Sequence, residues 1–397
     1  MNDLILLYFI LLVFFGGFYF VIIATFSIGW FSLRQFRKTA PEPKTLVSVL
    51  VPARNEENII EKLLSNLCLQ NYPNHLYEII VIDDHSTDNT VRTVNNFISQ
   101  HKARLSNPDG NGTTGQGFSI KLLRIKGETQ TKAYKKKAIR TAIEQSSGNL
   151  IITTDADCLP DKNWIKTIVS LYETKQPKMI VGPVSFHREK TFFQKIQSLE
   201  FLSLIAMTAG AIKTGHPIMC NGANLAYEKQ AFFDVGGFGI DRFSSGDDVF
   251  LLQRIRKLFG SNSVWFLKSK DAFVYTEALD TLREFFDQRI RWASKNKGYD
   301  LKILVISFTV YMMNLLLLAA VAISLSFPGF WKTTAYIFAV KYIIDLPVLI
   351  GIVSFAKKMK LFVYSVPLIV IYPIYIILAG ALGIVSSYNW KGRKLKI

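Results

Sequence analysis

Acidic residues gather at three places in this sequence, and carboxylates are the side chains that bind divalent cations and accept protons. Asp155 and Asp157 directly follow the apolar run 150–154 and are separated by one residue. Alternate residues that leave a strand can direct two carboxylates to one point, which predicts a site for a divalent cation that bridges a diphosphate. Taken alone, such a pair is also typical of a turn with helix-capping carboxylates.

The second place is Asp83 and Asp84, at the end of the apolar run 78–82. Carboxylates at a strand end can accept hydrogen bonds from the base and ribose of a nucleotide. Asp88, a little further along, fits the N-cap of a helix. The third place is Asp247 and Asp248, which precede the amphipathic stretch 249–258. Either could cap a helix, and a carboxylate in a partly desolvated cleft is suited to act as a general base.

Gln288, Arg291 and Trp292 form a fourth candidate group, just ahead of a long apolar run. Arg291 could pair with a diphosphate, and Trp292 offers a flat face to a sugar ring. The same residue types are also typical of a belt at the membrane interface, where Trp and Arg are favoured.

The segments that must position these residues alternate between apolar runs and amphipathic stretches. The pattern predicts strands at 46–51, 78–82, 120–125 and 150–154, helices at 57–70, 89–100 and 132–145, and a surface insertion at 107–117. This order is typical of an α/β fold with a doubly wound, mostly parallel sheet. In such sheets ligands bind beyond the carboxyl ends of the strands, so the acidic pairs at 83–84 and 155–157 should converge on one cleft.

Four apolar runs indicate α-helical transmembrane segments. Residues 4–33 carry no charge and exceed the roughly 20 residues that cross a bilayer. The run is too long for a cleaved signal peptide and lacks a basic start. Further runs cover 303–331, 333–356 and 361–390. We therefore predict an N-terminal anchor at 1–33, a catalytic domain at 45–297, about three spans within 303–390, and a basic tail at 391–397.

The formal net charge of +17 is concentrated beside these runs, at 34–38, 357–360 and the tail. Anionic headgroups attract such clusters, so a membrane rather than a nucleic acid is the expected partner. Basic residues after the first span place the catalytic domain in the cytoplasm. Four spans would leave the basic tail on the opposite side, unless Pro367 and Pro373 break the last segment and return it.

The three cysteines, Cys68, Cys158 and Cys220, are widely separated and have no metal-ligand spacing, which favours reduced core thiols. Lys341 and Asp345 interrupt the third apolar run four residues apart, where they should neutralise each other on one helix face.

In this order, the motifs resemble those of family 2 glycosyltransferases with a GT-A-like, Rossmann-related fold. The similarity is greatest to the membrane-integrated branch that includes polysaccharide synthases and ceramide glucosyltransferase. It runs from about residue 47 to residue 297. It rests on Val51-Pro52-Ala53-Arg54-Asn55-Glu56, Asp83-Asp84, Asp155-Ala156-Asp157, Asn221-Gly222-Ala223-Asn224, Asp247-Asp248 and Gln288 to Trp292.

This resemblance implies an inverting transferase that uses a nucleotide sugar, most simply a UDP-sugar, together with Mg²⁺ or Mn²⁺. It implies that Asp248 is the catalytic base beside Asp247, and that Asp157 and Asp155 hold the metal. The implied donor contacts are Pro52, Arg54, Glu56, Asp83, Asp84, Lys136 and Asp155, and the implied acceptor or diphosphate contacts are Asn221, Gly222, Gln288, Arg291 and Trp292. Asp247 stands where relatives often carry Glu, and which of the lysines at 135–137 meets the donor is open.

Three functions remain to be distinguished. The nearly uniform apolar character of the spans favours transfer to a lipid or lipid-linked acceptor, since export of a polymer needs a polar path. A processive polysaccharide synthase of the same family is the alternative. A non-catalytic scaffold that only binds a nucleotide sugar belongs to another class and would release no nucleoside diphosphate. The expected location is the bacterial inner membrane, as part of the cell envelope, and a membrane partner subunit stays open.

Overall fold

The structure is a computed structural model that describes residues 2–37, 42–106, 118–124, 134–238, 246–385, 388–390 and 393–395. The chain divides into two compact units. The α/β unit comprises Arg34–Arg188 and Gly215–Glu277, and the helical unit comprises Met1–Leu33, Glu189–Thr214 and Ala278–Ile397. The predicted surface insertion at 107–117 lies outside the described residues.

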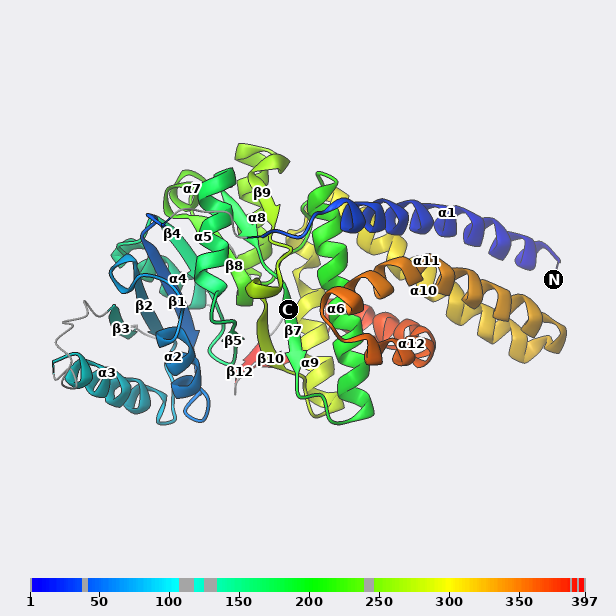
Figure 1. The fold of residues 1–397 in the computed structure, drawn as a ribbon. Helices are drawn as coiled ribbons and strands as arrows, with labels where there is room; N and C mark the ends of the chain where they lie inside the picture. The colour runs from blue at the N-terminus through cyan, green and yellow to red at the C-terminus, as the bar shows by residue number, and fades with distance from the viewer. Residues whose placement is uncertain are drawn as a thin grey trace. The chain divides into compact units, whose positions relative to one another are not determined.

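A seven-stranded sheet with the order β3-β2-β1-β4-β8-β6-β9 forms the centre of the α/β unit (Figure 1). Its strands are β1 (Val47–Ala53), β2 (Tyr77–Asp83), β3 (Ser119–Arg124), β4 (Leu150–Thr153), β6 (Met179–Val181), β8 (Leu225–Glu228) and β9 (Val264–Phe266). Strands β3, β2, β1 and β4 are parallel, whereas β8 runs antiparallel to both of its neighbours. The predicted mostly parallel sheet is therefore confirmed. Because every residue of β2 is buried, its central residues 79–82 are a continuous apolar run rather than an alternating one.

Helices α2 (Ile60–Cys68), α3 (Thr90–Ser106) and α4 (Tyr134–Gln145) connect the parallel strands. Strands β2 and β3 follow on one side of β1 and β4 on the other, so right-handed crossovers place α2 and α3 on one face of the sheet and α4 on the opposite face. The strand order thus reverses between β1 and β4, where ligands bind in sheets of this kind.

The rest of the α/β unit follows β4. Its helices are α5 (Trp164–Lys175), α7 (Lys229–Asp234) and α8 (Asp247–Phe259), with short 3₁₀ turns η1 (Asn74–Leu76), η2 (Gly222–Asn224), η3 (Ser261–Ser263) and η4 (Lys270–Ala272). A small sheet has the order β5 (Leu159–Pro160), β10 (Val274–Glu277) and β7 (Val184–His187). These short strands pair across long stretches of sequence, which is why the sequence pattern did not predict them.

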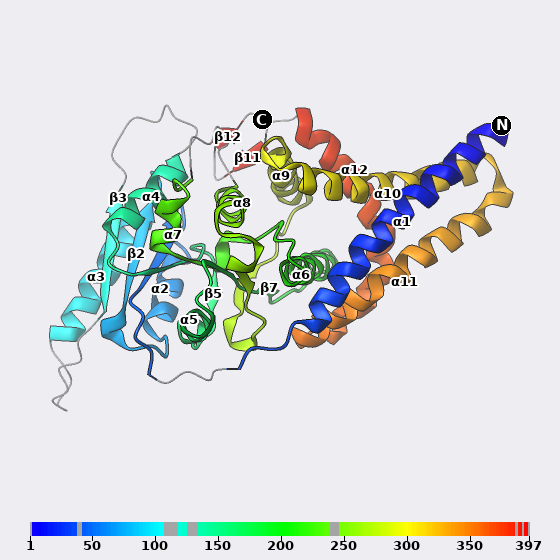
Figure 2. The ribbon, with the colours of Figure 1, turned by 90° about the horizontal axis from the view of Figure 1, so that it is seen from above.

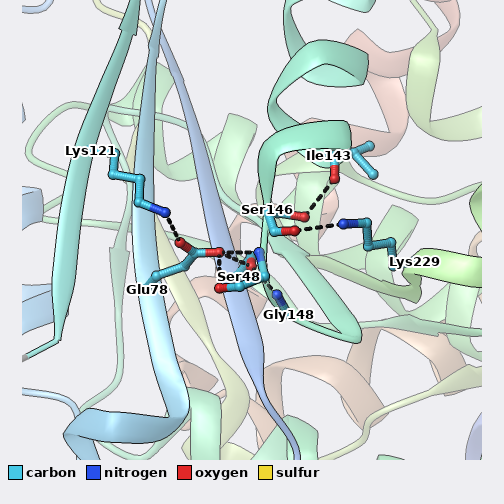
Figure 3. A network of polar contacts seen from close by, with 8 residues as sticks. Ser48, Glu78, Lys121, Ile143, Ser146, Gly148 and Lys229 are labelled. Atoms are coloured by element: carbon cyan, nitrogen blue, oxygen red, sulfur yellow. Dashed lines mark hydrogen bonds and ion pairs between the residues drawn. The ribbon is translucent and has the colours of Figure 1, made fainter.

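A buried carboxylate ties the amino ends of the parallel strands together (Figure 3). Glu78 of β2 accepts hydrogen bonds from the Ser48 hydroxyl of β1 at 2.6 Å and from the Lys121 ammonium of β3 at 2.7 Å. It also accepts the backbone N–H of Ser147 at 2.6 Å and its hydroxyl at 2.7 Å. Gly148 donates to the Ser48 hydroxyl, and a Cβ at Gly148 would lie 2.4 Å from the Ser48 nitrogen, so only glycine fits.

These contacts decide the charge of Glu78. Burial alone raises the pKa of the carboxyl, but the Lys121 ammonium and the donors of Ser48 and Ser147 outweigh it and lower the pKa to about 2. The network therefore holds an ionised carboxylate inside the sheet, at the end opposite to the one where ligands bind.

The helical unit contains α1 (Asn2–Ser32), α6 (Phe192–Lys213), α9 (Leu282–Ala293), α10 (Leu301–Ser326), α11 (Trp331–Phe355) and α12 (Ser365–Val385). It also contains η5 (Ser294–Gly298), η6 (Pro328–Phe330), η7 (Met359–Tyr364) and the hairpin of β11 (Tyr388–Trp390) and β12 (Arg393–Leu395). Among the residues that the structure describes, four stretches are long and apolar enough to cross a membrane, namely Asp3–Ser32, Leu301–Ser326, Pro328–Phe355 and Met359–Gly383. Figure 2 shows α1, α10 and α11 as long neighbouring helices.

Helix α6 was not predicted as part of this group. It packs against α1, and glycines let the two backbones come close together. A Cβ at Gly210 would lie 1.9 Å from the carbonyl oxygen of Phe26, and a Cβ at Gly29 would lie 2.3 Å from the carbonyl oxygen of Gly210, so neither position has room for a larger side chain. The segments 189–214 and 278–297 thus belong to the helical unit although they lie inside the range predicted as the catalytic domain.

Some polar side chains within the apolar helices form hydrogen bonds with one another. Lys341 donates to Asp345 at 2.7 Å, which confirms the predicted neutralisation, and the Tyr19 hydroxyl of α1 donates to the second oxygen of Asp345 at 2.7 Å. Helix α12 continues through Pro373, so this proline does not break the last apolar segment. The side chains of the basic tail lie outside the described residues.

Candidate active site

The loops that follow β1 and β2 are fastened to each other at the carboxyl edge of the sheet. Arg54 donates from Nη1 to the backbone carbonyls of Asp84 at 2.7 Å and His85 at 2.8 Å. Asn55 accepts the backbone N–H of Thr87 at 2.8 Å. Asn55 and His85 have φ angles of 53° and 55°, in the left-handed region that non-glycine residues rarely adopt. Such backbone strain is common at ligand sites, where the surroundings hold it in place.

The two predicted nucleotide-binding carboxylates lie at this edge. Asp83 ends β2 and accepts the backbone N–H of Ser86 at 3.1 Å, and Asp84 contacts His85 Nδ1 at 3.3 Å. Both side chains are buried, so a nucleotide would meet them within the loops rather than on an open surface. Asp88 accepts the N–H of Thr90, the first residue of α3, at 3.0 Å, so it binds the start of this helix from the position before the N-cap residue Asn89.

The other two donor-loop residues lie beside them. Pro52 is a partly buried residue of β1, and Glu56 donates its backbone N–H to the Thr90 hydroxyl at 2.7 Å. Their predicted contacts with a donor stay predictions.

Asp155 and Asp157 lie two and four residues after the end of β4, at the strand end where they were predicted. Their carboxylate oxygens and the Cys158 sulfur all lie within 4.8 Å of one another, close enough to hold one metal ion. The Thr276 hydroxyl of β10 donates to Asp157 at 3.3 Å. Asp157 is exposed and Asp155 half-buried, so both can reach a ligand at the edge of the sheet. Two carboxylates fit Mg²⁺ or Mn²⁺, which prefer oxygen ligands and take the rest from waters and phosphates.

Cys158 belongs to this cluster, although its spacing in the sequence gave no reason to include it. Burial raises the pKa of its thiol, and the carboxylates of Asp157 and Asp155 raise it further. The thiol lies 3.7 Å from an oxygen of Asp157 and donates toward it. Since the thiolate is the form of cysteine that binds metals, the oxygen ligands of the two aspartates carry the metal interpretation.

Asp248 lies in the first turn of α8, where its carboxylate is held by two backbone donors. It accepts the N–H of Gly222 at 3.1 Å and that of Val249 at 2.8 Å. The N-terminus of a helix stabilises negative charge, and these donors do so as well. Asp248 is therefore arranged as an ionised carboxylate, the form that can accept a proton.

A short chain of hydrogen bonds links this carboxylate to the end of β4. Thr153, the last residue of β4, donates its hydroxyl to the carbonyl of Gly222 at 2.8 Å, and Gly222 donates its N–H to Asp248 at 3.1 Å. Asp155 follows two residues after Thr153. The structure thus brings the acidic pair at 155–157 and the acidic pair at 247–248 to the same edge of the sheet.

Lys136 is the lysine that faces this edge. Its side chain is buried on α4, with Nζ 3.7 Å from Asp247 Oδ1 and 5.4 Å from the ring centre of Phe250, whereas Lys137 is exposed. The side chain of Lys135 is outside the described part. Lys136, which was assigned to the donor, therefore also neutralises one member of the acidic pair on α8.

The segment Asn221 to Asn224 has a clear structural role. Asn221 caps η2 by accepting the N–H of Ala223 at 3.0 Å. Asn224 is buried, donates to the carbonyls of Pro183 and Ala272, and accepts from Trp164 Nε1 at 2.9 Å. This segment carries Gly222 and so fixes the donor that orients Asp248.

The remaining predicted residues lie in the helical unit. Gln288, Arg291 and Trp292 are half-buried on α9, which begins with a capping box formed by Thr281 and Glu284. The structure therefore gathers the predicted site in two groups, with the carboxylates and Lys136 in the α/β unit and these three residues on α9.

Two family models match the chain. Residues 150–383, more than half of the chain, match the glycosyl transferase family group 2, and residues 48–236 match glycosyl transferase family 2. The chain therefore belongs to glycosyltransferase family 2, as its motifs indicated.

Individual proteins agree with this assignment. The probable glycosyltransferase YdaM of Bacillus subtilis (strain 168) is 27% identical over 261 residues, which cover 65% of this chain and 57% of YdaM. A beta-monoglucosyldiacylglycerol synthase of Nostoc sp. (strain PCC 7120) is 25% identical over 265 residues, which cover 66% of this chain and 51% of that protein. The chain thus matches little more than half the length of these relatives.

The fold also has a counterpart among solved structures. The mannosyltransferase PcManGT from Pyrobaculum calidifontis, in complex with GDP-Man and Mn²⁺, has a TM-score of 0.55 and 19% sequence identity. The similarity covers 94% of this chain and 98% of that one. It confirms the predicted GT-A-like fold with additional apolar helices.

Proposed function

We propose that this protein is an inverting hexosyltransferase that moves a sugar from a nucleotide donor, a UDP-sugar, to a lipid or lipid-linked acceptor at a membrane. The observation that carries this proposal is the hydrogen-bonded path from Thr153 through Gly222 to Asp248. It sets a carboxylate that can accept a proton at the same sheet edge as a carboxylate pair that can bind a diphosphate-bound metal. A base near an activated sugar is what a single displacement requires.

In this reaction Asp248 takes the proton from an acceptor hydroxyl. The hydroxyl oxygen forms a bond to the anomeric carbon while the bond from that carbon to the diphosphate breaks, so the nucleoside diphosphate leaves with the electron pair. Attack opposite to the leaving group inverts the anomeric centre. The Gly222 N–H keeps Asp248 in place, and Lys136 offsets the charge of Asp247, so that the two carboxylates do not repel each other unopposed.

Asp155 and Asp157 would hold Mg²⁺ or Mn²⁺, with Asp157 as the more exposed ligand. When bound, the cation supplies positive charge that offsets the charge developing on the leaving diphosphate. Asp83, Asp84 and the loop residues Pro52, Arg54 and Glu56 would bind the nucleoside beside it, since they belong to the neighbouring strand ends.

The acceptor side would involve Gln288, Arg291 and Trp292 of α9, together with Asn221 and Gly222. Arg291 would pair with the diphosphate and Trp292 would stack on a sugar ring, as the family resemblance implies.

The apolar helices support a lipid acceptor over an exported polymer. Three of their buried polar side chains bond within their own helix, since Thr309 and Ser324 donate to carbonyls one turn back and the Asn314 amide nitrogen does the same at 2.7 Å. The charged side chains Lys341 and Asp345 pair with each other, and Asp345 also accepts from the Tyr19 hydroxyl. A polymer path would need polar groups that face water. The related synthase from Nostoc is named for a glucosylated diacylglycerol, which agrees with a lipid acceptor.

We further propose that the α/β unit lies on the cytoplasmic side of a bacterial inner membrane, because basic residues follow the first span. A cysteine in place of the exposed Arg140, in a Cys68→Ser background, should react with an impermeant maleimide only after cells are opened. Reaction in intact cells would place the unit outside.

One experiment tests the proposed activity. The purified full chain is incubated with native membranes, Mn²⁺ and a panel of radiolabelled UDP- and GDP-sugars, and the product is separated into lipid-soluble and polymeric fractions. We expect label in a lipid product together with release of nucleoside diphosphate. Label in a polymer alone would favour a processive synthase, and donor binding without release of nucleoside diphosphate would favour a non-catalytic scaffold.

A further inference from the structure

A buried arginine on α9 has no place in the mechanism so far. Arg289 follows Gln288 directly and precedes Trp292 by three residues, yet only 5% of it is exposed. Its guanidinium carbon lies 4.2 Å from the ring centre of Trp292 and 4.5 Å from that of Phe285. Residues three and four apart share a helix face, so the guanidinium is held between two aromatic rings of its own helix.

The same guanidinium also binds Gln288, the residue before it. Nη1 of Arg289 donates to Oε1 of Gln288 at 2.8 Å. A glutamine amide has one oxygen that accepts and one nitrogen that donates. With the oxygen engaged by Arg289, the Gln288 amide presents its N–H donors to a ligand, which suits the oxygens of an acceptor.

A second helix secures this arrangement. Nη2 of Arg289 donates to Glu200 of α6, whose side chain is also buried, in a charge-assisted hydrogen bond. Phe201, the next residue of α6, lies 6.4 Å from Trp292 between ring centres, tilted by 33°. Glu200 and Phe201 therefore fix the Arg289 and Trp292 side chains from the same segment.

We propose that Arg289 is a positioning residue for acceptor binding, which holds the Gln288 amide and the Trp292 ring in their working orientation while Glu200 holds Arg289. This inference rests on the proposed function only for what Gln288 and Trp292 contact. A planar guanidinium suits this task, because it can stack between two rings and donate in its plane to two acceptors at once, and a lysine ammonium cannot.

The decisive variant is therefore Arg289→Lys, which keeps the charge opposite Glu200 and removes the stacking plane. The control is Arg283→Lys on the same helix, where the arginine is exposed. The full chain is labelled with 5-fluorotryptophan, and the Trp292 fluorine signal is assigned among the six tryptophans by Trp292→Phe. We expect the Trp292 signal to move in Arg289→Lys and to stay in place in Arg283→Lys.

Kinetics should separate positioning from donor binding. With UDP-glucose and dioleoylglycerol in phosphatidylglycerol vesicles, Arg289→Lys should lose on the order of 10²-fold in kcat/KM for the lipid, since small misplacements of a binding group have effects of that size. Binding of UDP with Mn²⁺, measured by calorimetry, should not change. A wild-type protein without transferase activity would contradict the proposed function and leave the fluorine signal as the test of Arg289.

A double variant covers the case in which Arg289→Lys does not fold. Arg289→Met with Glu200→Leu replaces the buried pair by apolar groups, and such replacements often keep or raise stability. We expect thermal stability to recover while the Trp292 signal stays displaced. The proposal is overturned if either variant shows the wild-type Trp292 signal, or if UDP binding falls in proportion to transfer.

Discussion

Carboxylates at the two ends of the parallel strands lie in different surroundings. At the amino ends, Glu78 is buried and accepts hydrogen bonds from Ser48, Ser147 and Lys121. At the carboxyl ends, Asp157 is exposed and accepts from a threonine and a cysteine side chain at long distance. Glu78 lies within a strand and Asp157 in the turn that follows another strand of the same sheet, but only Asp157 keeps oxygens available for a ligand.

This difference separates stability from function. A carboxylate with all of its acceptor sites used stabilises the fold, and its loss leaves buried donors unpaired. A carboxylate at the ligand edge contributes little to the fold and is needed for binding or chemistry. Substitutions at the two ends should therefore affect different measurements, and each prediction below tests this separation.

The largest effect is expected at Asp157. Asp157→Ala removes an oxygen ligand from the cluster with Asp155, and since changes in the outer shell of a metal site already reduce affinity by about 10- to 100-fold, the loss of a ligand should exceed that range. Calorimetric titration of UDP-glucose with Mn²⁺ should then show no metal-dependent binding, while thermal stability stays at the wild-type value. Undiminished binding in this variant would exclude Asp157 as a metal ligand.

At the opposite end, Glu78→Gln should destabilise the α/β unit by about 2–3 kcal/mol, because the buried ion pair with Lys121 is lost and the Ser48 and Ser147 donors are left with a weaker acceptor. Hydrogen exchange of the β2 amides in the full chain reports this locally. The control is Glu144→Gln, whose exposed pair with Arg140 is worth only about 0.3–0.5 kcal/mol. Equal exchange in the two variants would refute the structural role of Glu78.

Acid should weaken the same network. The pKa of Glu78 is lowered from 4.5 to about 2, so its stabilisation is present above pH 4.5 and is lost as the pH falls toward 2. The shift corresponds to about 3 kcal/mol. In thermal unfolding of the full chain, the difference between wild type and Glu78→Gln should shrink over this pH range, and a difference that does not depend on pH would contradict the ionised carboxylate.

The smallest effect is expected at Asp247. Asp247→Asn removes a charge that Lys136 offsets at 3.7 Å but leaves the Gly222 contact to Asp248 intact. A partly buried pair of this kind is worth about 1 kcal/mol, so transfer should fall by less than about tenfold. Steady-state transfer rates measure this, and a loss as large as that of an Asp248 variant would make Asp247 the better candidate for the base.

Local patterns predicted the centre of the α/β unit well. Buried β-branched runs marked β1, β2 and β4, and the acidic residues after them lie where a parallel sheet places its ligands. The sequence did not predict which lysine of α4 faces the site, because this depends on how the helix is rotated about its axis. In the structure Lys136 is buried and Lys137 is exposed.

Contacts between distant segments were harder to predict. Helix α6 contains Lys195 and Glu200, so it did not register as an apolar run, and its close contact with α1 depends on two glycines far apart in the chain. Arg289 could have been found, because Phe285 and Trp292 lie on its helix face, but its carboxylate partner on α6 is 89 residues away. Such pairings need the fold itself.

Asp248→Asn tests the central claim most directly. The amide keeps the size of the side chain and one of the two oxygens that accept from the Gly222 and Val249 N–H groups, but it cannot take a proton. Positioned base catalysis is worth about 10² to 10⁴ in rate. Transfer from UDP-glucose to dioleoylglycerol is measured beside UDP-glucose affinity for the same protein. We predict a loss of transfer within that range with donor affinity unchanged. Near-normal transfer, or a loss of affinity equal to the loss of transfer, would contradict the assignment of Asp248 as the catalytic base.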